Sequence, residues 1–328
     1  MRKKIVDSTL IEDNLKTSYE IRDRNFSSDI YFFAPTLKKY ESKTFCNSDK
    51  PVFVPISLTG SSCALNCKHC GGKLLESMYC VDSNDELIQL VHKLHKNGLK
   101  GLLITGGSCI DGSIPMKPFL PTLRKLKEDL NIQLAAHTGL VDKETANKMR
   151  GVFDIAMMDI IGRQETIQEI YNLHRKPEDF YKSLENILDQ GISIVPHIVI
   201  GLHYGNILGE FDALEKLTSY DLSTLVFVIL ENLKNTVFDK MKIKPPPVTE
   251  IRELFKLGRL SFPETPVLLG CAKPGGEMER KIDRVAIMAG FNGIAYPCDD
   301  AIDFSKRLGL NVQFSEYCCS FVFKLIES

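Results

Sequence analysis

From residue 51 onward, short apolar and β-branched runs alternate with amphipathic stretches, and this alternation restricts the chain to few folds. The runs are Pro51–Leu58, Leu99–Thr105, Ile132–Ala136, Val152–Met158, Ile192–Ile200, Thr224–Leu230, Pro266–Gly270 and Gly293–Pro297. Eight such runs, each usually followed by a helical pattern, predict βα units with parallel strands. One unit per roughly 30 residues fits a (β/α)8 barrel of about 250 residues. We therefore predict an α/β fold with a TIM-type (β/α)8 barrel over residues 51–310.

The flanking segments differ from the barrel pattern. Residues 1–50 contain a helical stretch and a short aromatic run around Ile30, and we expect them to form an N-terminal cap on the barrel. Residues 311–328 form a C-terminal tail with the sequence Cys-Cys-Ser, which we expect to lie over the barrel mouth. A doubly wound sheet is the weaker alternative, because no Gly-x-Gly-x-x-Gly follows the first predicted strand.

Three cysteines, Cys63, Cys67 and Cys70, follow the first predicted strand with the spacing C-x3-C-x2-C. Iron–sulfur clusters are usually held by cysteine thiolates, commonly four of them. Three thiolates would leave one iron of a cubane without a protein ligand, free to bind a small molecule. Zinc is the alternative, since tetrahedral sulfur sites also suit this ion. His69 lies between the second and third cysteines and is poorly spaced to complete a tetrahedron.

Composition sets broad limits on function and location. The net charge of -1 provides no basic field for nucleic acid. No apolar run approaches the roughly 18 residues that a membrane span needs. The first residues lack the apolar core of a signal peptide, so we expect a cytoplasmic protein. Ten cysteines in such a protein indicate metal chemistry more than disulfides.

The triplet resembles that of the radical S-adenosylmethionine (radical SAM) superfamily, apart from His69 where family members often have an aromatic residue. This resemblance implies a [4Fe–4S] cluster whose open iron binds SAM, and a 5′-deoxyadenosyl radical that takes hydrogen from an unactivated carbon. Cys63, Cys67 and Cys70 would then be catalytic as well as metal ligands. The cofactor carries the difficult chemistry while the protein positions it.

In such barrels the active site lies at the C-terminal ends of the strands. The Gly-Gly motif after the second predicted strand resembles the superfamily motif that binds the amino group of SAM, with serine in place of the usual acidic third residue. A purely structural turn is the alternative there. The cofactor-binding candidates at these strand ends are Gly106, Gly107, Ser108, His137, Asp159, His197 and Gly201.

Several later cysteines fall at predicted strand ends or in the tail: Cys271, Cys298, Cys318 and Cys319, with Cys109 in reserve. Buried structural cysteines would be expected to scatter along strands and helices instead. We therefore expect these cysteines to hold an auxiliary [4Fe–4S] cluster, although separate thiols are the alternative.

The motifs from Phe53 through the tail are similar to those of biotin synthase-related proteins, and more narrowly to one subunit of the two-protein lipoyl synthases. The motifs that carry this resemblance are Phe53–Gly60 with the triplet, Gly270–Glu277, Ile282–Asn292 and Cys318–Ser320. The resemblance covers nearly the whole chain. The Arg-Ser-Ser-Ser run and the N-terminal auxiliary cysteine triplet of single-chain lipoyl synthase are both absent, so the ligands of that enzyme cannot be transferred.

The resemblance implies sulfur insertion into C–H bonds of an octanoyl-lysine on a lipoyl carrier protein, with the auxiliary cluster as the sulfur source. The implied partners are this carrier, a homologous radical SAM subunit, and an electron donor such as ferredoxin or flavodoxin. One alternative is another biotin synthase-like radical SAM reaction on a free small molecule. Another is a non-catalytic iron–sulfur scaffold.

Overall fold

In the computed structural model, which describes residues 8–327, the strands form one eleven-stranded parallel sheet. Its order is β11-β1-β10-β9-β8-β7-β6-β5-β4-β2-β3. The eight predicted strands are all present, with ends that differ from the predicted ones by a few residues. They are β2 (Phe53–Ser57), β4 (Gly101–Thr105), β5 (Gln133–His137), β6 (Ile155–Asp159), β7 (Ser193–Ile200), β8 (Leu225–Ile229), β9 (Val267–Leu269) and β10 (Gly293–Ala295).

The sheet is a curled half-barrel and differs from the predicted closed (β/α)8 barrel. Two strands outside the predicted set, β1 (Asp29–Phe33) and β11 (Asn311–Ser315), extend the sheet beyond β10. At the other edge β2 pairs with the short β3 (Tyr79–Cys80). Because β1 occupies the edge of β10 that would otherwise pair with β2, the described strands leave the sheet open. Residues 1–50 thus contribute a strand to the main sheet, whereas the predicted domain boundaries stay a prediction.

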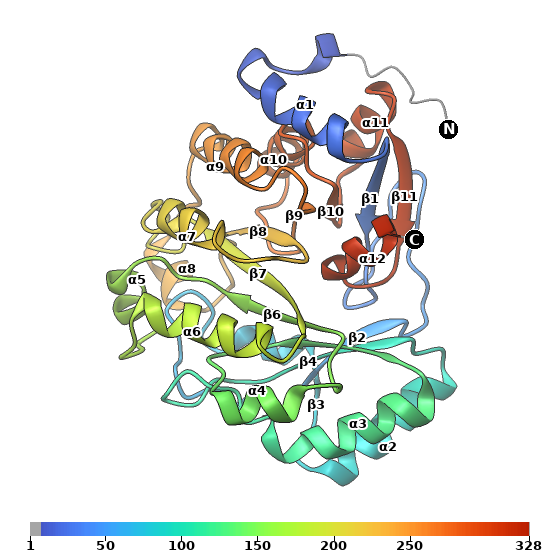
Figure 1. Cartoon of the computed structure of the whole chain (residues 1–328), viewed down its shortest axis with the longest axis vertical. Helices are drawn as coiled ribbons and strands as arrows, with labels where there is room; N and C mark the ends of the chain where they lie inside the picture. Colours follow the sequence, from blue (N-terminus) through green and yellow to red (C-terminus); the bar gives the residue numbers. More distant parts are fainter. Residues whose placement is uncertain (1–7, 328) are drawn as a thin grey trace.

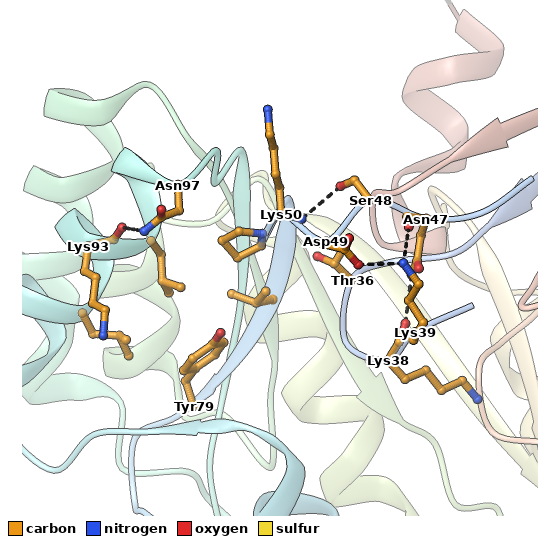
Figure 2. Close-up of a pocket in the computed structure, with 14 residues that line it drawn as sticks. Thr36, Lys38, Lys39, Asn47, Ser48, Asp49, Lys50, Tyr79, Lys93 and Asn97 are labelled. Atoms are coloured by element: carbon orange, nitrogen blue, oxygen red, sulfur yellow. Dashed lines mark hydrogen bonds and ion pairs between the residues drawn. The ribbon is translucent and has the colours of Figure 1, made fainter. Parts of the chain in front are cut away.

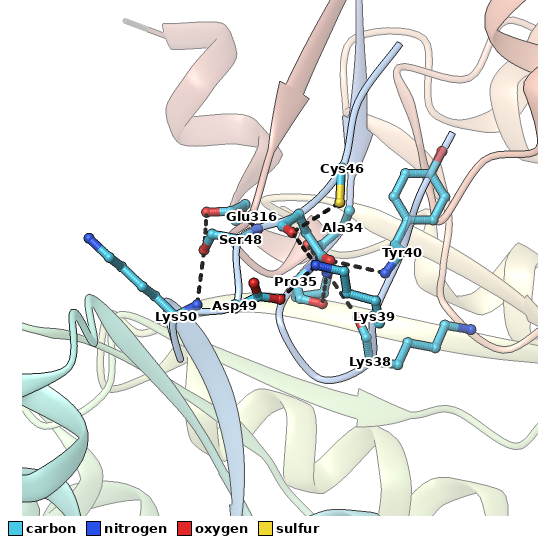
Figure 3. Close-up of polar contacts among 11 residues, drawn as sticks. Ala34, Pro35, Lys38, Lys39, Tyr40, Cys46, Ser48, Asp49, Lys50 and Glu316 are labelled. Atoms are coloured by element: carbon cyan, nitrogen blue, oxygen red, sulfur yellow. Dashed lines mark hydrogen bonds and ion pairs between the residues drawn. The ribbon is translucent and has the colours of Figure 1, made fainter. Parts of the chain in front are cut away.

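A loop of residues 34–52, here called the seam loop, crosses the opening between β1 and β2. The Thr36 hydroxyl donates to the Phe53 carbonyl and accepts from the Phe53 N–H, both at 3.2 Å. It thus provides hydrogen-bond partners for two backbone groups at the exposed edge of β2. The Tyr40 hydroxyl donates to the carbonyl of Pro297, just after β10, at 2.7 Å. Within the loop, the Lys39 ammonium lies 2.7 Å from Asp49, and buried Asn47 accepts from the Tyr40 N–H (Figure 3).

Helices cover the outer face of the sheet, and α1 packs against α9 and α10 (Figure 1). They are α1 (Lys16–Asn25), α2 (Asn84–Lys96), α3 (Leu120–Leu130), α4 (Lys143–Met149), α5 (Gln164–Glu169), α6 (Pro177–Leu188), α7 (Glu210–Leu217), α8 (Val237–Met241), α9 (Val248–Ser261), α10 (Glu277–Met288) and α11 (Asp299–Arg307). Alternate strand residues such as Val54 and Ile56 pack outward in the large hydrophobic core. No helix among residues 8–327 combines the length and apolarity needed to cross a bilayer.

The C-terminal tail fills the inside of the curled sheet. After β11 the chain forms a 3-10 turn (Cys319–Phe321) and α12 (Val322–Glu327). The Phe321 ring lies 5.8 Å from the Phe53 ring, and the Lys324 ammonium lies 3.7 Å from Asp154, just before β6. Both partners are at the N-terminal ends of strands. The tail therefore packs in the lower interior, and the expectation that it lies over the mouth was wrong. Burial of Phe321 and Val322 explains the difference.

Candidate functional site

The cysteine triplet lies on the loop that follows β2, at the C-terminal end of the sheet. Cys67 is buried, whereas Cys63 and Cys70 are half-buried. Ligand atoms of Cys67, His69 and Cys70 lie within 4.8 Å of one another, so His69 is closer to the two sulfurs than its spacing suggested. The His69 Nδ1 atom is buried without a hydrogen-bond partner in the described structure. The donors of this loop therefore suit a metal centre by chemistry and by position.

Neighbouring segments fix the shape of the triplet loop. The Gly71 N–H donates to the Cys67 carbonyl at 2.7 Å, and the Lys68 N–H donates to the Ile170 carbonyl at 2.9 Å. The Asn172 side chain donates to the Leu65 carbonyl at 3.0 Å. Residues 170–172, which follow α5, thus hold the triplet loop from the side.

Two sulfurs of the triplet interact directly. A hydrogen bond between Cys67 and Cys70 lowers the pKa of Cys70 and raises the pKa of Cys67. The charge of Cys63 also raises the Cys67 pKa, so Cys63 lies near the pair. Because the thiolate is the form that binds metal, the lowered pKa of Cys70 favours metal binding by this loop.

The Gly-Gly motif packs directly against the triplet loop. The Gly107 N–H donates to the Thr59 hydroxyl at 2.7 Å, and the Ala64 N–H donates to the Ser108 carbonyl at 2.8 Å. A Cβ atom on Gly107 would lie 1.8 Å from the Ser62 carbonyl oxygen and 2.7 Å from the Cys63 Cα. Glycine is required there for this close approach. A role of Gly106, Gly107 and Ser108 in SAM binding stays a prediction.

Inward-facing polar side chains form a layer below the triplet, here called the polar layer: His137, Asp159 and His197. The His137 Nε2 atom lies 3.7 Å from Asp159, and the two histidine rings meet edge to face at 5.5 Å. Burial lowers the pKa of His197 to about 4, helped by nearby His137. The ring of His197 is therefore neutral at physiological pH.

Tyr171 joins the polar layer to the triplet loop. Its hydroxyl donates to Asp159 at 3.2 Å, its ring lies 5.3 Å from the His69 ring, and its carbonyl lies 3.7 Å from the Cys67 sulfur. Burial raises the pKa of Tyr171 well above its usual range, and the charge of Asp159 adds to this effect. Tyr171 is thus a neutral hydrogen-bond donor in the interior.

Gly201 ends β7 in a left-handed conformation, with φ of +81°. Its N–H donates to the buried Glu210 carboxylate at 2.7 Å, and Pro246 lies where a Cβ would be. Burial raises the pKa of Glu210. These contacts explain the glycine by local packing, and its predicted role in cofactor binding stays a prediction.

A second group of sulfurs, here called the inner thiols, consists of Cys271, Cys318 and Cys319. A hydrogen bond to Cys319 lowers the pKa of Cys318 and raises that of Cys319. Although Cys271 as a whole is exposed, burial of its sulfur raises its pKa, and the charge of Cys318 raises it further. Cys318 and Cys319 are neighbours in the tail, whereas Cys271 lies on the turn after β9, and an auxiliary cluster on these cysteines stays a prediction.

The tail thiols Cys318 and Cys319 lie deeper than the polar layer. The Cys318 sulfur lies 4.0 Å from the Met157 sulfur, and the buried Ser320 hydroxyl donates to the same atom at 2.9 Å. Met157 precedes Asp159 by two residues on β6, and both face inward. Two residues of a strand span about 6.6 Å. The polar layer therefore lies between the triplet and the tail thiols Cys318 and Cys319.

Cys298 has different surroundings. It precedes α11, and its N–H donates to Asp283 at 2.9 Å. Burial raises the Cys298 pKa to about 12, and Asp283 adds to this. Cys298 packs against the outer core, whereas Cys318 and Cys319 belong to the inner one. Among residues 8–327, no recorded contact joins Cys298 to the inner thiols, and its role as a ligand stays a prediction.

Three charged or aromatic side chains surround the inner thiols. The Lys38 ammonium lies 4.3 Å from the centre of the Tyr296 ring. Burial raises the pKa of Tyr296, and the three inner thiols raise it further. Burial also raises the pKa of Glu231, while Lys38 opposes this. The charge of Lys38 also lowers the pKa of Cys271, so this lysine favours the thiolate form of one inner thiol.

A groove of about 530 Å³ lies between the seam loop, β2 and α2, and is here called the seam groove (Figure 2). Lys38, Lys39, Lys50 and Lys93 line it, but they do not converge on one point. Lys39 is paired with Asp49, and Lys50 and Lys93 point in different directions (Figure 2). None of the triplet cysteines lines this groove. It is therefore separate from the candidate site.

The sequence did not single out Tyr171, Met157 or Lys38. Tyr171 lies in an irregular segment after α5, with no strand end to mark it. Met157 reads as an ordinary strand residue, and Lys38 is one of many lysines in the chain. Only the fold places these side chains beside the two sets of cysteines.

The fold and the triplet together define the class of this domain. Residues 57–217 match the model of the radical SAM superfamily. This part of the chain is therefore a radical SAM superfamily domain, which implies a [4Fe–4S] cluster and SAM as cofactors. The residues present fit the cluster, because three cysteines lie on one loop beside a backbone that the Gly-Gly motif brings close. No curated protein sequence matches the chain.

Solved structures of radical SAM enzymes share this fold. Methylornithine synthase (PylB) has a TM-score of 0.58 at 13% identity, covering 98% of this chain and 92% of that one. The [FeFe]-hydrogenase maturase HydG has a TM-score of 0.61 at 15% identity, covering 95% and 69%. Streptococcus suis SuiB bound to S-adenosylmethionine has a TM-score of 0.52 at 13% identity, covering 73% and 53%. At these identities the likeness concerns the fold alone.

Proposed function

We propose that the protein is a radical SAM enzyme that inserts sulfur into C–H bonds of an octanoyl-lysine on a lipoyl carrier protein. In this proposal Cys63, Cys67 and Cys70 hold the SAM-binding cluster. The inner thiols hold an auxiliary [4Fe–4S] cluster that is the sulfur source. A homologous radical SAM subunit shares the task of completing the lipoyl group.

The observation that carries the proposal is the stacking of two sets of sulfurs inside one half-barrel. The triplet lies above the polar layer, and Cys318 of the inner thiols lies below it beside Met157. An acyl chain held at the polar layer would have a radical source on one side and a sulfur source on the other. When bound, the two clusters and SAM would supply one-electron cleavage of SAM and sulfide for a new C–S bond.

The residues of the chain would orient the substrate and keep the interior dry. Neutral His197 and the Tyr171 hydroxyl offer hydrogen-bonding groups without charge. Apolar side chains of the inner core, among them Ile155, Val195 and Phe321, form apolar walls below the polar layer. Such walls exclude water and unwanted hydrogen donors from a reactive intermediate.

The test uses the whole protein reconstituted without oxygen with iron and sulfide. Two four-iron clusters would give about eight iron atoms per chain. Mass spectrometry then follows an octanoyl-lysine carrier after reaction with SAM and dithionite, with and without a candidate partner subunit. Sulfur addition to the octanoyl group supports the proposal.

Two results would favour a different function for the protein. SAM cleavage with an unchanged carrier in the presence of each candidate partner would favour a radical SAM reaction on a free small molecule. Absence of SAM cleavage from protein that contains both clusters would favour a non-catalytic iron–sulfur scaffold. Tetrahedral zinc on the triplet, in protein prepared without oxygen, would remove the basis of the proposal altogether.

A further inference from the structure

Helix α8 packs directly on the triplet loop from outside. The Phe238 N–H donates to the carbonyl of Lys68, the residue after Cys67, at 3.2 Å. The Phe238 ring is fully buried, with its centre 6.5 Å from the His69 ring and 5.5 Å from the Tyr204 ring. The short helix is therefore an outer wall of the loop that carries the triplet.

The outward side of this wall is both apolar and basic. Val237 and Met241 are 43% and 54% exposed, which is unusual for large apolar side chains in this protein. Four exposed lysines flank them along the chain, and none forms an ion pair with a residue of the described part of the chain: Lys234, Lys240, Lys242 and Lys244. The carboxylate of Asp239 accepts a hydrogen bond from the N–H of Asn235 at 2.8 Å. We call these six apolar and basic side chains the α8 surface.

We propose that the α8 surface is the docking site for an acidic electron-transfer protein that carries a flavin or an iron–sulfur cluster. This inference rests on the proposed radical SAM function. Each SAM cleaved to methionine and a 5′-deoxyadenosyl group consumes one electron, and the donor protein supplies it and is oxidised by one electron. A donor seated on α8 would be separated from the triplet loop only by Phe238 and His69.

The form of the surface suits a transient redox partner. Electron-transfer complexes bury small interfaces, below about 1,200 Å². Unpaired lysines around an apolar centre attract an acidic partner over long range and raise the rate of encounter. Val237 and Met241 would supply the small apolar contact, and methionine adapts to partners of different shape.

The seam groove offers a matched control, because it also carries exposed lysines. Its residues Lys50 and Lys93 lie on the seam loop and α2, away from the triplet, and neither forms a recorded ion pair within residues 8–327 (Figure 2). A double change Lys234→Glu/Lys240→Glu and a double change Lys50→Glu/Lys93→Glu alter the net charge equally. Only the first alters the surface next to the triplet.

The first experiment measures binding of a purified acidic flavodoxin, without any need for turnover. Isothermal titration at low salt is run on cluster-free protein and on reconstituted protein. We expect Lys234→Glu/Lys240→Glu to weaken binding at least about tenfold, because close charge pairs across an interface contribute strongly. The Lys50→Glu/Lys93→Glu protein should bind as the wild type does. Equal binding by all three proteins would overturn the proposal.

The second experiment compares reductants. With reduced flavodoxin, Lys234→Glu/Lys240→Glu should raise the KM for the donor at least about tenfold, whereas dithionite-driven SAM cleavage should stay at the wild-type rate. A raised KM for the acyl carrier under dithionite would assign the α8 surface to the carrier and overturn the donor proposal. Failure of wild-type SAM cleavage with dithionite would instead contradict the proposed function, while the binding measurement would still test the docking site.

Discussion

The triplet and the inner thiols are built in opposite ways. Cys63, Cys67 and Cys70 belong to one loop, and hydrogen bonds within that loop and from neighbouring loops fix its shape. The inner thiols come from two distant segments, the turn after β9 and the tail that folds into the half-barrel. The triplet therefore needs only one segment of chain to bring its sulfurs together. The inner site exists only when the tail is packed, so its chemistry depends on the stability of the whole fold.

The largest expected effect separates the two sites by cysteine substitution. Cys67→Ala should remove the triplet cluster and abolish SAM cleavage. Cys271→Ala should leave SAM cleavage within about twofold of the wild type but prevent sulfur transfer, because it touches only the inner site. Iron content, 5′-deoxyadenosine release and product mass are measured on the same samples. Cys298→Ala is the control, and its contacts with Asp283 instead of the inner thiols predict unchanged iron content.

Equal losses of SAM cleavage in Cys67→Ala and Cys271→Ala would contradict a division of labour between the sites. Loss of iron in Cys298→Ala would show that this residue reaches the inner site after all. Cys298, which precedes α11, would then count as a fourth ligand of the inner site.

A smaller effect is expected from the backbone that shapes the triplet loop. In Gly107→Ala the new methyl group would collide with the Ser62 carbonyl at 1.8 Å and displace the loop at Cys63. Misplacement of a reacting group by about 1 Å can lower a rate about 100-fold, so SAM cleavage should fall on that scale. SAM affinity, by equilibrium dialysis on reconstituted protein, should fall with it.

The control for Gly107→Ala is Gly275→Ala in the turn after Cys271, where an added Cβ meets no atom within 4 Å. That protein should keep both SAM cleavage and iron. Wild-type activity in Gly107→Ala would mean that the triplet loop tolerates displacement, and the contrast between a rigid local site and a packed inner site would weaken.

The loop that carries Cys271 depends on a buried ion pair. The Lys273 ammonium lies 2.5 Å from Asp283, with both side chains almost fully buried. Removing one partner leaves an uncompensated buried charge, so Lys273→Met should lower the free energy of unfolding by about 3–5 kcal/mol. Urea denaturation measures this change. The exposed pair of Lys281 and Glu277 provides the control, and Lys281→Met should cost less than about 1 kcal/mol.

The double change Lys273→Met/Asp283→Leu should recover part of the lost stability, because it removes both charges. If Lys273→Met and Lys281→Met cost the same, the ion pair does not hold the turn after β9. Some other interaction would then have to link the inner site to the stability of the whole fold.

The sequence was sufficient for the strands and for the triplet. Alternation of apolar runs marked β2 and β4 through β10, because strands buried on both faces read as continuous apolar segments. The triplet could be recognised from the sequence because its three cysteines lie close together in one loop. β1 was mistaken for part of a cap, since a short aromatic run gives no information on its partners. Its pairing with β10 and β11 depends on contacts far apart in the chain.

The inner site was only partly predictable. Placement at strand ends suggested Cys271 and Cys298 alike. In the fold the charge of Cys318 acts on Cys271, whereas the Cys298 sulfur interacts with Asp283. The position of the tail followed from burial of Phe321 and Val322, which no local pattern distinguishes from a lid over the mouth. Contacts of this kind depend on the packed interior and not on neighbouring residues in the sequence.

The smallest effect concerns the polar layer between the two sites. Burial lowers the pKa of His197 from 6.5 to about 4, so the unfolded chain binds more protons than the folded protein between these values. Stability from this group is therefore complete above pH 6.5 and is lost as the pH falls toward 4. The shift corresponds to roughly 3 kcal/mol. Urea denaturation of wild type and His197→Gln from pH 7 to pH 4 should show the wild type losing more stability by about this amount. Parallel curves would mean that water reaches His197, and a wet polar layer could not shield a radical passing between the triplet and the inner thiols.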